Sequence, residues 1–398
     1  MPTTNGNRKI LDLKRWEFCA PAPVTTQSGA LVASSRHFRQ QQLFLRSNTE
    51  AYVYNPAEDA WVQLASPALA GIFGAGAAAT AGAWSTGSTV GAASLTATGG
   101  TTSTIVTNQT LARDLRGYKI HILSGPNNGA VIDIVSNTVG ANATITVGTQ
   151  ASAFTASTVY RLLTPRWYVL GAGTLAAGSF RVYDYATNTW ATLSNTGLAA
   201  TIGTDGKLIA TPSIVDGVFK AFATGTATAG GASTIDNSSK AWTTNQWANF
   251  QIRLTAGTGA GQIRTISSNT GTQITVSAAW TTQPDATSQY SIEGNDNFLY
   301  YIGNNAVTLY RYDITANTWS TLTPGVARGA APVAGMSGHW VHSVEENDWN
   351  VENSILNGRR IYSFRGNGSV LDYYDIPSNA WTNAITYAPN QESYGAGT

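Results

Sequence analysis

The sequence contains few of the residues on which covalent or charge-based chemistry depends. Only 11% of its 398 residues are Asp, Glu, Lys or Arg, whereas roughly 25% is usual in globular proteins. A single cysteine, Cys19, excludes an intrachain disulfide framework. No apolar run reaches the length of about 18 residues that a transmembrane helix needs, so we expect no membrane insertion. Residues 1–9 lack the apolar segment of a signal peptide, and we expect synthesis in the cytoplasm.

The scarcity of charge also limits the possible partners. The formal net charge is +1, so no global field attracts nucleic acid or an anionic membrane surface. We therefore expect no direct nucleic-acid recognition. Hydroxyls, amides and glycine turns must make up most of the surface, and such a composition is common in proteins that function outside cells or inside large assemblies.

A repeated phrase is the most informative feature that is present. Four segments begin with Tyr followed by Asp or Asn, continue through polar turn formers and end with Trp. They are residues 54–61, 183–190, 312–319 and 374–381. The first three tryptophans are 129 residues apart, and the fourth follows after 62. A unit that recurs in this way, twice with a long insertion, is typical of a β-propeller built from repeated blades.

Each phrase lies within a longer pattern of short strands. An apolar stretch that ends near glycine precedes it, as in residues 167–171 and 299–303. One strand ends at the Tyr-Asp pair and another begins at the Trp, as runs of β-branched and aromatic residues between turn formers indicate. Stretches of small residues, such as 71–79 and 329–335, predict the remaining strand, because the crowded axis of a propeller favours Gly and Ala.

This pattern resembles the kelch repeat, in which an apolar strand ending in glycines is paired with a downstream strand that carries Tyr-Asp and leads to Trp. The resemblance implies an all-β, kelch-like β-propeller with four recognisable blades. The blades are residues 31–74, 163–226, 291–325 and 326–398. The chain departs from the strict kelch pattern at the glycine doublet, which is Gly171-Ala172-Gly173 in the second blade and absent from the first.

Two inserted small β domains account for the long intervals, and they repeat one another. The inserted domains are residues 75–162 and 227–290. The shared tripeptides are Ser-Thr-Ile at 103–105 and 233–235, and Ile-Thr-Val at 145–147 and 274–276. In the second domain, residues 251–266 alternate around a glycine turn, which predicts a β-hairpin.

The second inserted domain resembles a β module of tailed-bacteriophage structural proteins. The residues that carry this likeness are 247–253, 276–280 and 284–288. The resemblance implies that the chain is a virion component.

Residues 1–30 precede the first blade as a basic N-terminal arm. They contain Arg8, Lys9, Lys14 and Arg15 together with scattered apolar residues. Such a segment gains little from burying so few apolar groups by itself. We expect the arm to dock on an acidic neighbour in an assembly, and a solvated terminus is the alternative.

Residues suited to catalysis or metal binding are scarce. The four histidines are His37, His121, His339 and His342. His339 and His342 are three positions apart on a predicted strand and thus point to opposite faces, which argues against a shared metal. No Cys/His cluster has zinc spacing, and the glycine runs at 171–173 and 257–261 open no helix that could bind phosphate. We expect no catalytic, cofactor-binding or metal-ligating residues, and no cofactor.

One acidic cluster, residues 345–352, is an exception to this scarcity. Its carboxylates could bind calcium or supply the acid pair of a glycan hydrolase. The segment lacks the spacing and the glycine of an EF-hand loop. We interpret it as a solvated loop between blades.

The tryptophans are the remaining candidates for contact. Those of the repeated phrase occupy fixed positions and are expected in the blade cores. Trp84, Trp247 and Trp349 lie outside the phrase. These three are the predicted candidates for stacking on a sugar or contacting a partner.

We interpret the chain as a non-enzymatic structural component of a tailed-phage virion, a ring subunit of the tail, neck or nozzle. It would act through contacts with other virion proteins and with copies of itself. Two alternatives stay open. One is an adhesin of the particle that binds a host receptor or surface glycan, and the other is a glycan hydrolase that uses Glu345 and Glu346.

Overall fold

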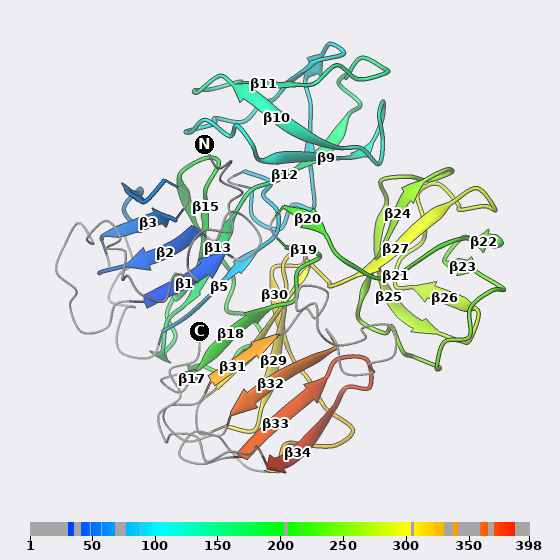
Figure 1. Ribbon diagram of the computed structural model, residues 1–398. Coiled ribbons are helices and arrows are strands. Elements are labelled where there is room, and N and C mark those ends of the chain that lie inside the picture. The colour runs from blue at the N-terminus through cyan, green and yellow to red at the C-terminus, as the bar shows by residue number, and fades with distance from the viewer. Residues whose placement is uncertain are drawn as a thin grey trace, which may run out of the picture.

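The fold is all-β, as predicted. The computed structural model describes residues 31–35, 41–47, 49–56, 58–67, 77–87, 89–202, 206–215, 217–303, 306–329, 337–340, 359–364 and 370–386. All regular elements in these segments are strands (Figure 1), and none of the segments forms a helix that could span a membrane. The predicted N-terminal arm, residues 1–30 with Cys19, lies outside the described residues.

Four antiparallel sheets of four strands each contain one copy of the repeated phrase. The first sheet is β1 (Leu31–Ser35), β2 (Gln41–Leu45), β3 (Ala51–Asn55) and β4 (Ala60–Gln63). The second is β5 (Ala78–Gly82), β13 (Arg166–Leu170), β15 (Phe180–Asp184) and β16 (Thr189–Thr192). The third is β18 (Lys207–Ala210), β28 (Phe298–Ile302), β29 (Leu309–Asp313) and β30 (Thr318–Thr321). The fourth is β31 (Ser337–Trp340), β32 (Arg360–Phe364), β33 (Val370–Asp375) and β34 (Ala380–Thr386).

The first strand of each sheet lies beside the first strand of the next. Strand β1 contacts β5, β5 contacts β18, and β18 contacts β31 (Figure 1). Within the second sheet, Gly82 of β5 leaves room for its neighbour on β13, because a Cβ atom there would lie 2.8 Å from the Tyr168 ring. Strand β5 was expected within the inserted domain 75–162 and β18 within the blade 163–226. Their pairing with β13 and β28 assigns each of them to the sheet that follows it in the chain.

Two further sheets have seven strands each and the same strand order. The first is β6 (Leu95–Thr96), β12 (Val159–Leu163), β9 (Lys119–Ser124), β10 (Val131–Asn137), β11 (Thr144–Val147), β8 (Thr104–Val106) and β7 (Gly99–Gly100). The second is β21 (Ala221–Thr226), β27 (Gln289–Glu293), β24 (Gln251–Ala256), β25 (Ile263–Asn269), β26 (Gln273–Val276), β23 (Thr234–Asp236) and β22 (Ala229–Gly231). We call residues 95–163 module 1 and residues 221–293 module 2. The predicted hairpin over 251–266 is confirmed as β24 and β25.

The two modules repeat one another in detail. Each has a β-bulge at the same place, between Ile134 and Ser136 in module 1 and between Ile266 and Ser268 in module 2. Each closes its core with isoleucine, valine and tyrosine side chains at matching positions. These buried pairs are Ile105 and Ile235, Ile120 and Ile252, Ile145 and Ile274, Val147 and Val276, and Tyr160 and Tyr290. The internal repeat of the sequence is thus also a repeat of structure.

An asparagine at the end of the bulged strand fixes one loop in each module. Asn137 accepts a hydrogen bond from the Leu115 backbone N–H at 2.7 Å and donates to the Arg113 carbonyl at 2.9 Å. Asn269 makes the same two bonds, to Trp247 and Thr243. This asparagine is the middle residue of the repeated Ser-Asn-Thr tripeptide, at 136–138 and 268–270.

Four short strands form two additional two-stranded sheets. One contains β14 (Gly173–Thr174) and β17 (Thr201–Ile202), and the other contains β19 (Ile214–Val215) and β20 (Val218–Phe219). The second of these lies where the chain leaves the third sheet for module 2 (Figure 1).

The repeated phrase forms a tight connection between the third and fourth strands of each four-stranded sheet. Its Tyr and Trp are directly paired, with ring centroids 5.0–5.6 Å apart. The Asn or Asp two positions before the Trp has a positive φ, a conformation that these residue types tolerate better than most. Its side chain accepts the Tyr hydroxyl hydrogen bond at 2.5–2.8 Å. The pairs are Tyr54–Asp59, Tyr183–Asn188, Tyr312–Asn317 and Tyr374–Asn379.

The same asparagine also binds the preceding sheet. Asn188 accepts from the Ala65 N–H at 3.0 Å, and Asn317 accepts from the Ser194 N–H at 2.9 Å. Asn379 donates to the Thr323 carbonyl at 2.9 Å. Each partner follows the Trp of the previous phrase by four residues, so in each of the last three phrases one side chain links its sheet to the preceding one.

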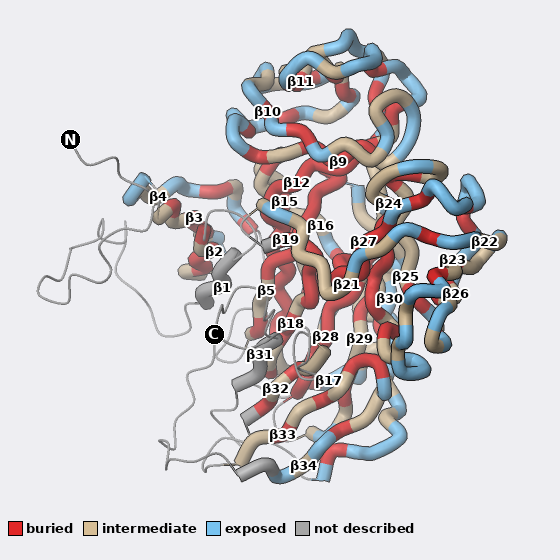
Figure 2. Tube along the Cα trace, turned by 45° about the vertical axis from the view of Figure 1, so that its right-hand side comes forward, coloured by how far each residue is buried: buried red, intermediate tan, exposed pale blue. Residues whose placement is uncertain are grey.

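Strand β28 is buried along its length (Figure 2), but the burial of the phrase tryptophans differs from one sheet to the next. Trp319 and Trp381 are 5% and 3% exposed, and they belong to the core as predicted. Trp61 and Trp190 are only half-buried, so the prediction that all four are core residues is wrong for these two. The Trp190 indole reaches the edge of the first sheet, where it donates to the Ala65 carbonyl at 2.9 Å.

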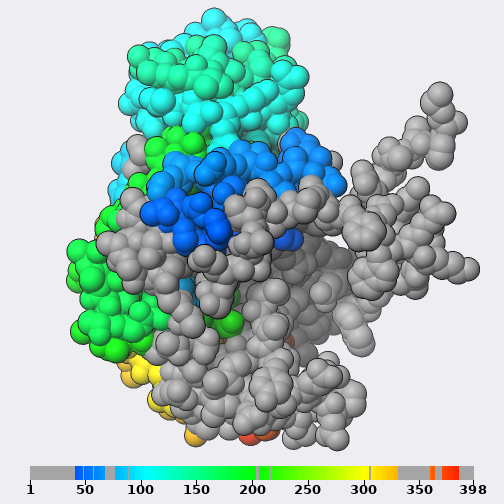
Figure 3. Space-filling view, turned by 90° about the vertical axis from the view of Figure 1, so that its left-hand side faces the viewer, coloured from blue at the N-terminus to red at the C-terminus, as the bar shows by residue number. Residues whose placement is uncertain are grey.

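Side-chain hydrogen bonds anchor the modules to the four-stranded sheets. In module 1, Tyr118 donates to Gln41 of β2 at 2.7 Å, and Figure 3 shows this module above the first sheet. In module 2, Asn249 accepts from Arg311 of β29 at 2.9 Å. Tyr118 and Asn249 both lie at the entry of the hairpin that begins the central part of their module.

Candidate functional site

The two modules contact each other through the same turn. Residues 125–129 lie in the turn between β9 and β10, and residues 257–261 lie in the turn between β24 and β25. Asn128 donates to the Ala260 carbonyl at 2.8 Å. A Cβ atom on Gly129 would lie 3.3 Å from the Thr255 carbonyl oxygen, and one on Gly261 would lie 2.5 Å from that of Leu123. Because Leu123 and Thr255 are equivalent positions, the contact is reciprocal, with a local pseudo-two-fold relation.

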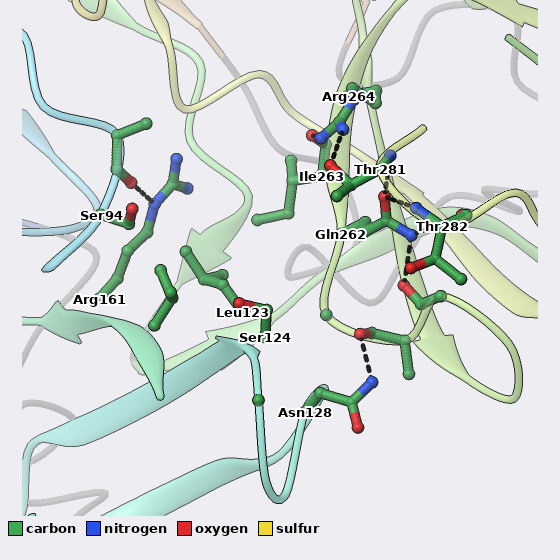
Figure 4. A pocket seen from close by; sticks show the side chains of 16 residues that line it. Ser94, Leu123, Ser124, Asn128, Arg161, Gln262, Ile263, Arg264, Thr281 and Thr282 are labelled. Atoms are coloured by element: carbon green, nitrogen blue, oxygen red, sulfur yellow. Dashed lines mark hydrogen bonds between the residues drawn. The ribbon is translucent and has the colours of Figure 1, made fainter. Parts of the chain in front are cut away.

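A cleft of about 490 Å³ lies beside this contact, with walls from both modules (Figure 4). Its volume is within the range of roughly 300–1,000 Å³ that is usual for ligand sites. The lining residues include serine, threonine, asparagine and glutamine side chains, a small apolar strip and two arginines, Arg161 and Arg264. No Asp, Glu or aromatic side chain is among them.

Arg161 is a buried cation without a carboxylate partner. It lies in β12, is 8% exposed, and its guanidinium stacks on the Trp84 ring with 4.0 Å to the centroid. Its Nε donates to the Ala93 carbonyl at 2.5 Å. Among the described residues, nothing else bonds to this guanidinium, so its two terminal nitrogens are available on the cleft side (Figure 4).

Arg161 stays charged despite its burial. Burial lowers its pKa to about 10, and the nearby negative charge of Asp296 acts in the opposite direction. A pKa of this size leaves the guanidinium protonated at neutral pH. The fold therefore retains a desolvated positive charge at the wall of the cleft.

Arg264 lines the other side of the cleft and has only neutral partners. It lies in β25, and its guanidinium donates to the Ala279 carbonyl at 3.0 Å and to the Thr281 hydroxyl at 3.1 Å. The Trp280 ring lies beneath it, with 5.5 Å to the centroid. Within the described residues, no carboxylate forms an ion pair with Arg264, so its charge is not compensated locally.

Gln262 holds the wall that carries Arg264. Its side-chain N–H donates to the Thr282 carbonyl at 2.8 Å, and its carbonyl oxygen accepts from the Thr281 N–H at 2.7 Å. These bonds tie the β24–β25 hairpin to the segment that follows Trp280. The arrangement fixes the Arg264 side of the cleft before any ligand is present.

The two arginines do not belong to the internal repeat. The position equivalent to Arg161 in module 2 is Ser291, because these residues pair with His121 and Arg253 at matching places. The position equivalent to Arg264 in module 1 is Ile132, since both pair with the matching isoleucines of β9 and β24. The structural requirements of the module therefore do not explain either arginine.

Three other buried charged residues near the modules, Arg253, Glu293 and Asp296, form one hydrogen-bonded cluster. Arg253 contacts both carboxylate oxygens of Glu293, Nε with Oε2 at 3.2 Å and Nη2 with Oε1 at 2.5 Å. Asp296 accepts from both the N–H and the hydroxyl of Ser213 at 2.5 Å. Gln251 bridges the two carboxylates with contacts of 3.4 Å. Each carboxylate of this cluster thus has direct hydrogen-bond donors, whereas Arg161 forms no ion pair within the described residues and is affected by Asp296 only through space.

The histidines and acidic residues considered as candidates for catalysis or metal binding do not form a common site within the described residues. His121 is 1% exposed and packs edge-on against Phe219, with centroids 5.2 Å apart. Burial, with Arg253 and Arg161 nearby, lowers the pKa of His121 well below its usual value. Within the described segments, no group of three His, Cys, Asp or Glu side chains could hold a metal ion. His37, His342, Trp349 and the acidic cluster 345–352 lie outside these segments, and only the backbone of His339 is described, in β31.

The prediction that Trp84 and Trp247 are free for contact is wrong. Trp84 is 2% exposed because it lies beneath the Arg161 guanidinium. Trp247 is 6% exposed and packs against Phe250, with ring centroids 5.9 Å apart.

Gly257, Gly259 and Gly261 all have positive φ, as the predicted turn requires.

Sequence reasoning did not single out Arg161 or Arg264. One signal was present, since Arg161 interrupts the otherwise apolar run Val-Tyr-Arg-Leu-Leu at 159–163 in a chain with few charges. A charged residue inside such a strand must find a partner or a cavity. No protein-family model matches the sequence, and no curated protein is similar enough to be identified as a relative.

Proposed function

We propose that the four four-stranded sheets are the blades of a kelch-like propeller and that the modules are domains inserted between its strands. The successive contacts among β1, β5, β18 and β31 support this proposal, because neighbouring blades of a propeller meet at their first strands. The links from Asn188, Asn317 and Asn379 to the preceding sheets support it as well.

We propose that the chain is a non-enzymatic structural component of a tailed-phage particle, a subunit of its tail, neck or nozzle. The observation that carries the proposal is the duplicated module, held as a reciprocal pair on a scaffold of linked sheets. Apart from the turns that contact each other, the duplicated modules present two matching outer surfaces, which subunit contacts in a symmetric assembly can use. The low fraction of charged residues, 11%, also suits a subunit of a permanent assembly.

The test is whether the chain is found in particles. Host cells are infected with the phage whose genome encodes the chain, and the released particles are purified on a density gradient. The proteins of the purified particles are then quantified by mass spectrometry. We expect the chain to sediment with the tail proteins at a constant number of copies per particle. A soluble host enzyme serves as the control for contamination. Recovery of the chain only in the soluble fraction, while the tail proteins sediment, would contradict the proposal.

A further inference from the structure

We propose that the cleft between the modules is a binding site for a carboxylate-bearing saccharide, with Arg161 and Arg264 as the residues that recognise its acid group. This inference concerns the ligand of the cleft and does not depend on the role of the chain in a particle. Its basis is a pair of guanidinium groups, from two different modules, that line one cavity without any acidic side chain.

The charge of the site calls for an anion. A buried charge is normally paired, because an uncompensated charge in a desolvated position is costly. Arg161 is buried, has a neutral hydrogen-bond acceptor at Nε only, and keeps its terminal nitrogens toward the cleft. A guanidinium offers a planar pair of donors that matches a carboxylate or phosphate. An anion in the cleft would supply the partner that the described residues do not.

The position of Arg161 is prepared before binding. The Trp84 ring covers one face of the guanidinium at 4.0 Å, and the Ala93 carbonyl holds its Nε. Little side-chain freedom then remains to be lost when the ligand binds, which favours affinity. Arg264 is held in a similar way by three neutral acceptors and the ring of Trp280.

The rest of the lining favours a sugar over other anions. The cleft of about 490 Å³ is far larger than an inorganic oxyanion needs, since one water occupies roughly 30 Å³. No aromatic side chain lines it, so a nucleobase would find no stacking platform. Hydroxyl and amide groups stand next to a short apolar strip, an arrangement that suits the hydroxyls and C–H faces of a sugar ring. These groups are Ser94, Ser124, Asn128 and Thr282, and the strip is Leu123, Val159 and Ile263.

The test compares acidic sugars with their neutral counterparts on the full chain. Galacturonic acid and its disaccharide are titrated by ligand-observed saturation-transfer NMR, with galactose and its disaccharide as the matched neutral probes. We expect the acidic probes to bind at least tenfold more tightly. Equal binding of both kinds, or no saturable binding of the acidic probes at millimolar concentration, would overturn the proposal. Inorganic phosphate is the competitor, and displacement at the same concentration as the uronate would show a general oxyanion site and overturn the saccharide assignment.

Substitutions of the two cleft arginines test whether the uronate binds in the cleft. R264Q and R161Q are each expected to weaken uronate binding at least tenfold, whereas R116Q is the matched control. Arg116 lies on module 1 with its side chain 71% exposed and does not line the cleft. Thermal melting verifies that each variant is folded. If R161Q fails to fold, R264Q decides the question by itself, because its side chain lies near the surface. Wild-type affinity in R264Q would place the sugar elsewhere and overturn the proposal.

Discussion

The Tyr312 hydroxyl donates a 2.5 Å hydrogen bond to Asn317, and the same oxygen of Asn317 accepts the Ser194 N–H of the preceding sheet. One asparagine thus closes its own strand connection and ties two sheets together. Asn317 has a φ of 53°, a backbone conformation that asparagine tolerates better than most residues. The position therefore calls for asparagine both for its backbone and for its side-chain oxygen.

Replacing Asn317 by Ala should therefore destabilise the protein by about 2–4 kcal/mol. The change leaves two donors without an acceptor, each at a cost of about 1–3 kcal/mol, and removes a residue type that tolerates positive φ. Asn317→Asp is the control, because Asp59 occupies this place in the first sheet and accepts from Tyr54. The free energy of unfolding in urea measures both. Equal losses for Ala and Asp would show that the acceptor oxygen is not the source of stability.

The tryptophans of the phrase should differ in their contribution. Trp319 is 5% exposed, so Trp319→Ala should cost about 3–5 kcal/mol, as truncation of buried aromatic residues does. Trp190 is half-buried, and Trp190→Ala should cost clearly less. Chemical denaturation of the two variants side by side makes the comparison. A smaller loss for Trp319 than for Trp190 would contradict the burial that the structure assigns to them.

Module 2 should be removable without loss of the four-stranded sheets. Its first and last strands pair, with Ala221 directly opposite Glu293, so the chain leaves and re-enters the scaffold at neighbouring points. Replacing residues 221–293 by a short Gly-Ser linker should leave a soluble, cooperatively unfolding β protein by circular dichroism. A deletion of comparable length that removes β13 and β15 is the control and should not fold. An insoluble product from the first deletion would mean that module 2 is part of the scaffold core.

Acid should destabilise the protein partly through His121. Its pKa in the folded state lies well below the usual value of about 6.5, mainly through burial, so the unfolded chain binds the proton more readily. The contribution of His121 to stability is complete above the usual pKa of about 6.5. It is lost as the pH falls from there toward the lower pKa of the folded state. Urea unfolding between pH 8 and pH 5 should show a steeper loss for the wild type than for His121→Gln. Parallel curves for the two proteins would refute the assignment.

The basic arm should matter for assembly and not for folding. Residues 1–30 precede β1 and contain the basic residues Arg8, Lys9, Lys14 and Arg15. Deleting residues 2–30 should leave the melting temperature within a few degrees of the wild type while preventing incorporation into particles. Mass spectrometry of purified particles measures the second effect. Normal incorporation of the truncated chain would refute the prediction, and a collapse of the melting temperature would show that the arm completes the fold.

The parts of the fold that depend on short-range order were predictable from sequence. The phrase that leads from Tyr183 to Trp190 encodes its turn, its positive φ at Asn188 and its strand pairing within eight residues. The tripeptide Ile-Thr-Val at 145–147 and 274–276 likewise predicted two related β units, and both segments are strands at the same place in their sheets.

The parts that depend on long-range pairing were not. Strand β5 is rich in Ala and Gly and has no pattern of its own, so only its pairing with β13 assigns it to the second sheet. Trp84 was expected to be available for contact. The guanidinium that covers it belongs to Arg161, which is far away in the sequence, so the sequence around Trp84 does not reveal its burial. The cleft escaped prediction for the same reason, since its two walls belong to modules whose contact is visible only in three dimensions.

The reciprocal contact between the turns at 125–129 and 257–261 has a consequence for how many modules can associate. In a contact of this kind, each partner offers the surface that it also receives, so a pair leaves no copy of that surface open for a third member. The chain thus contains the equivalent of a closed dimer, with both halves supplied by one gene and held at high effective concentration by the scaffold between them. Growth of an assembly from these chains must proceed through other surfaces. The duplication also freed the two halves to diverge, and the arginines of the cleft are places where they have done so.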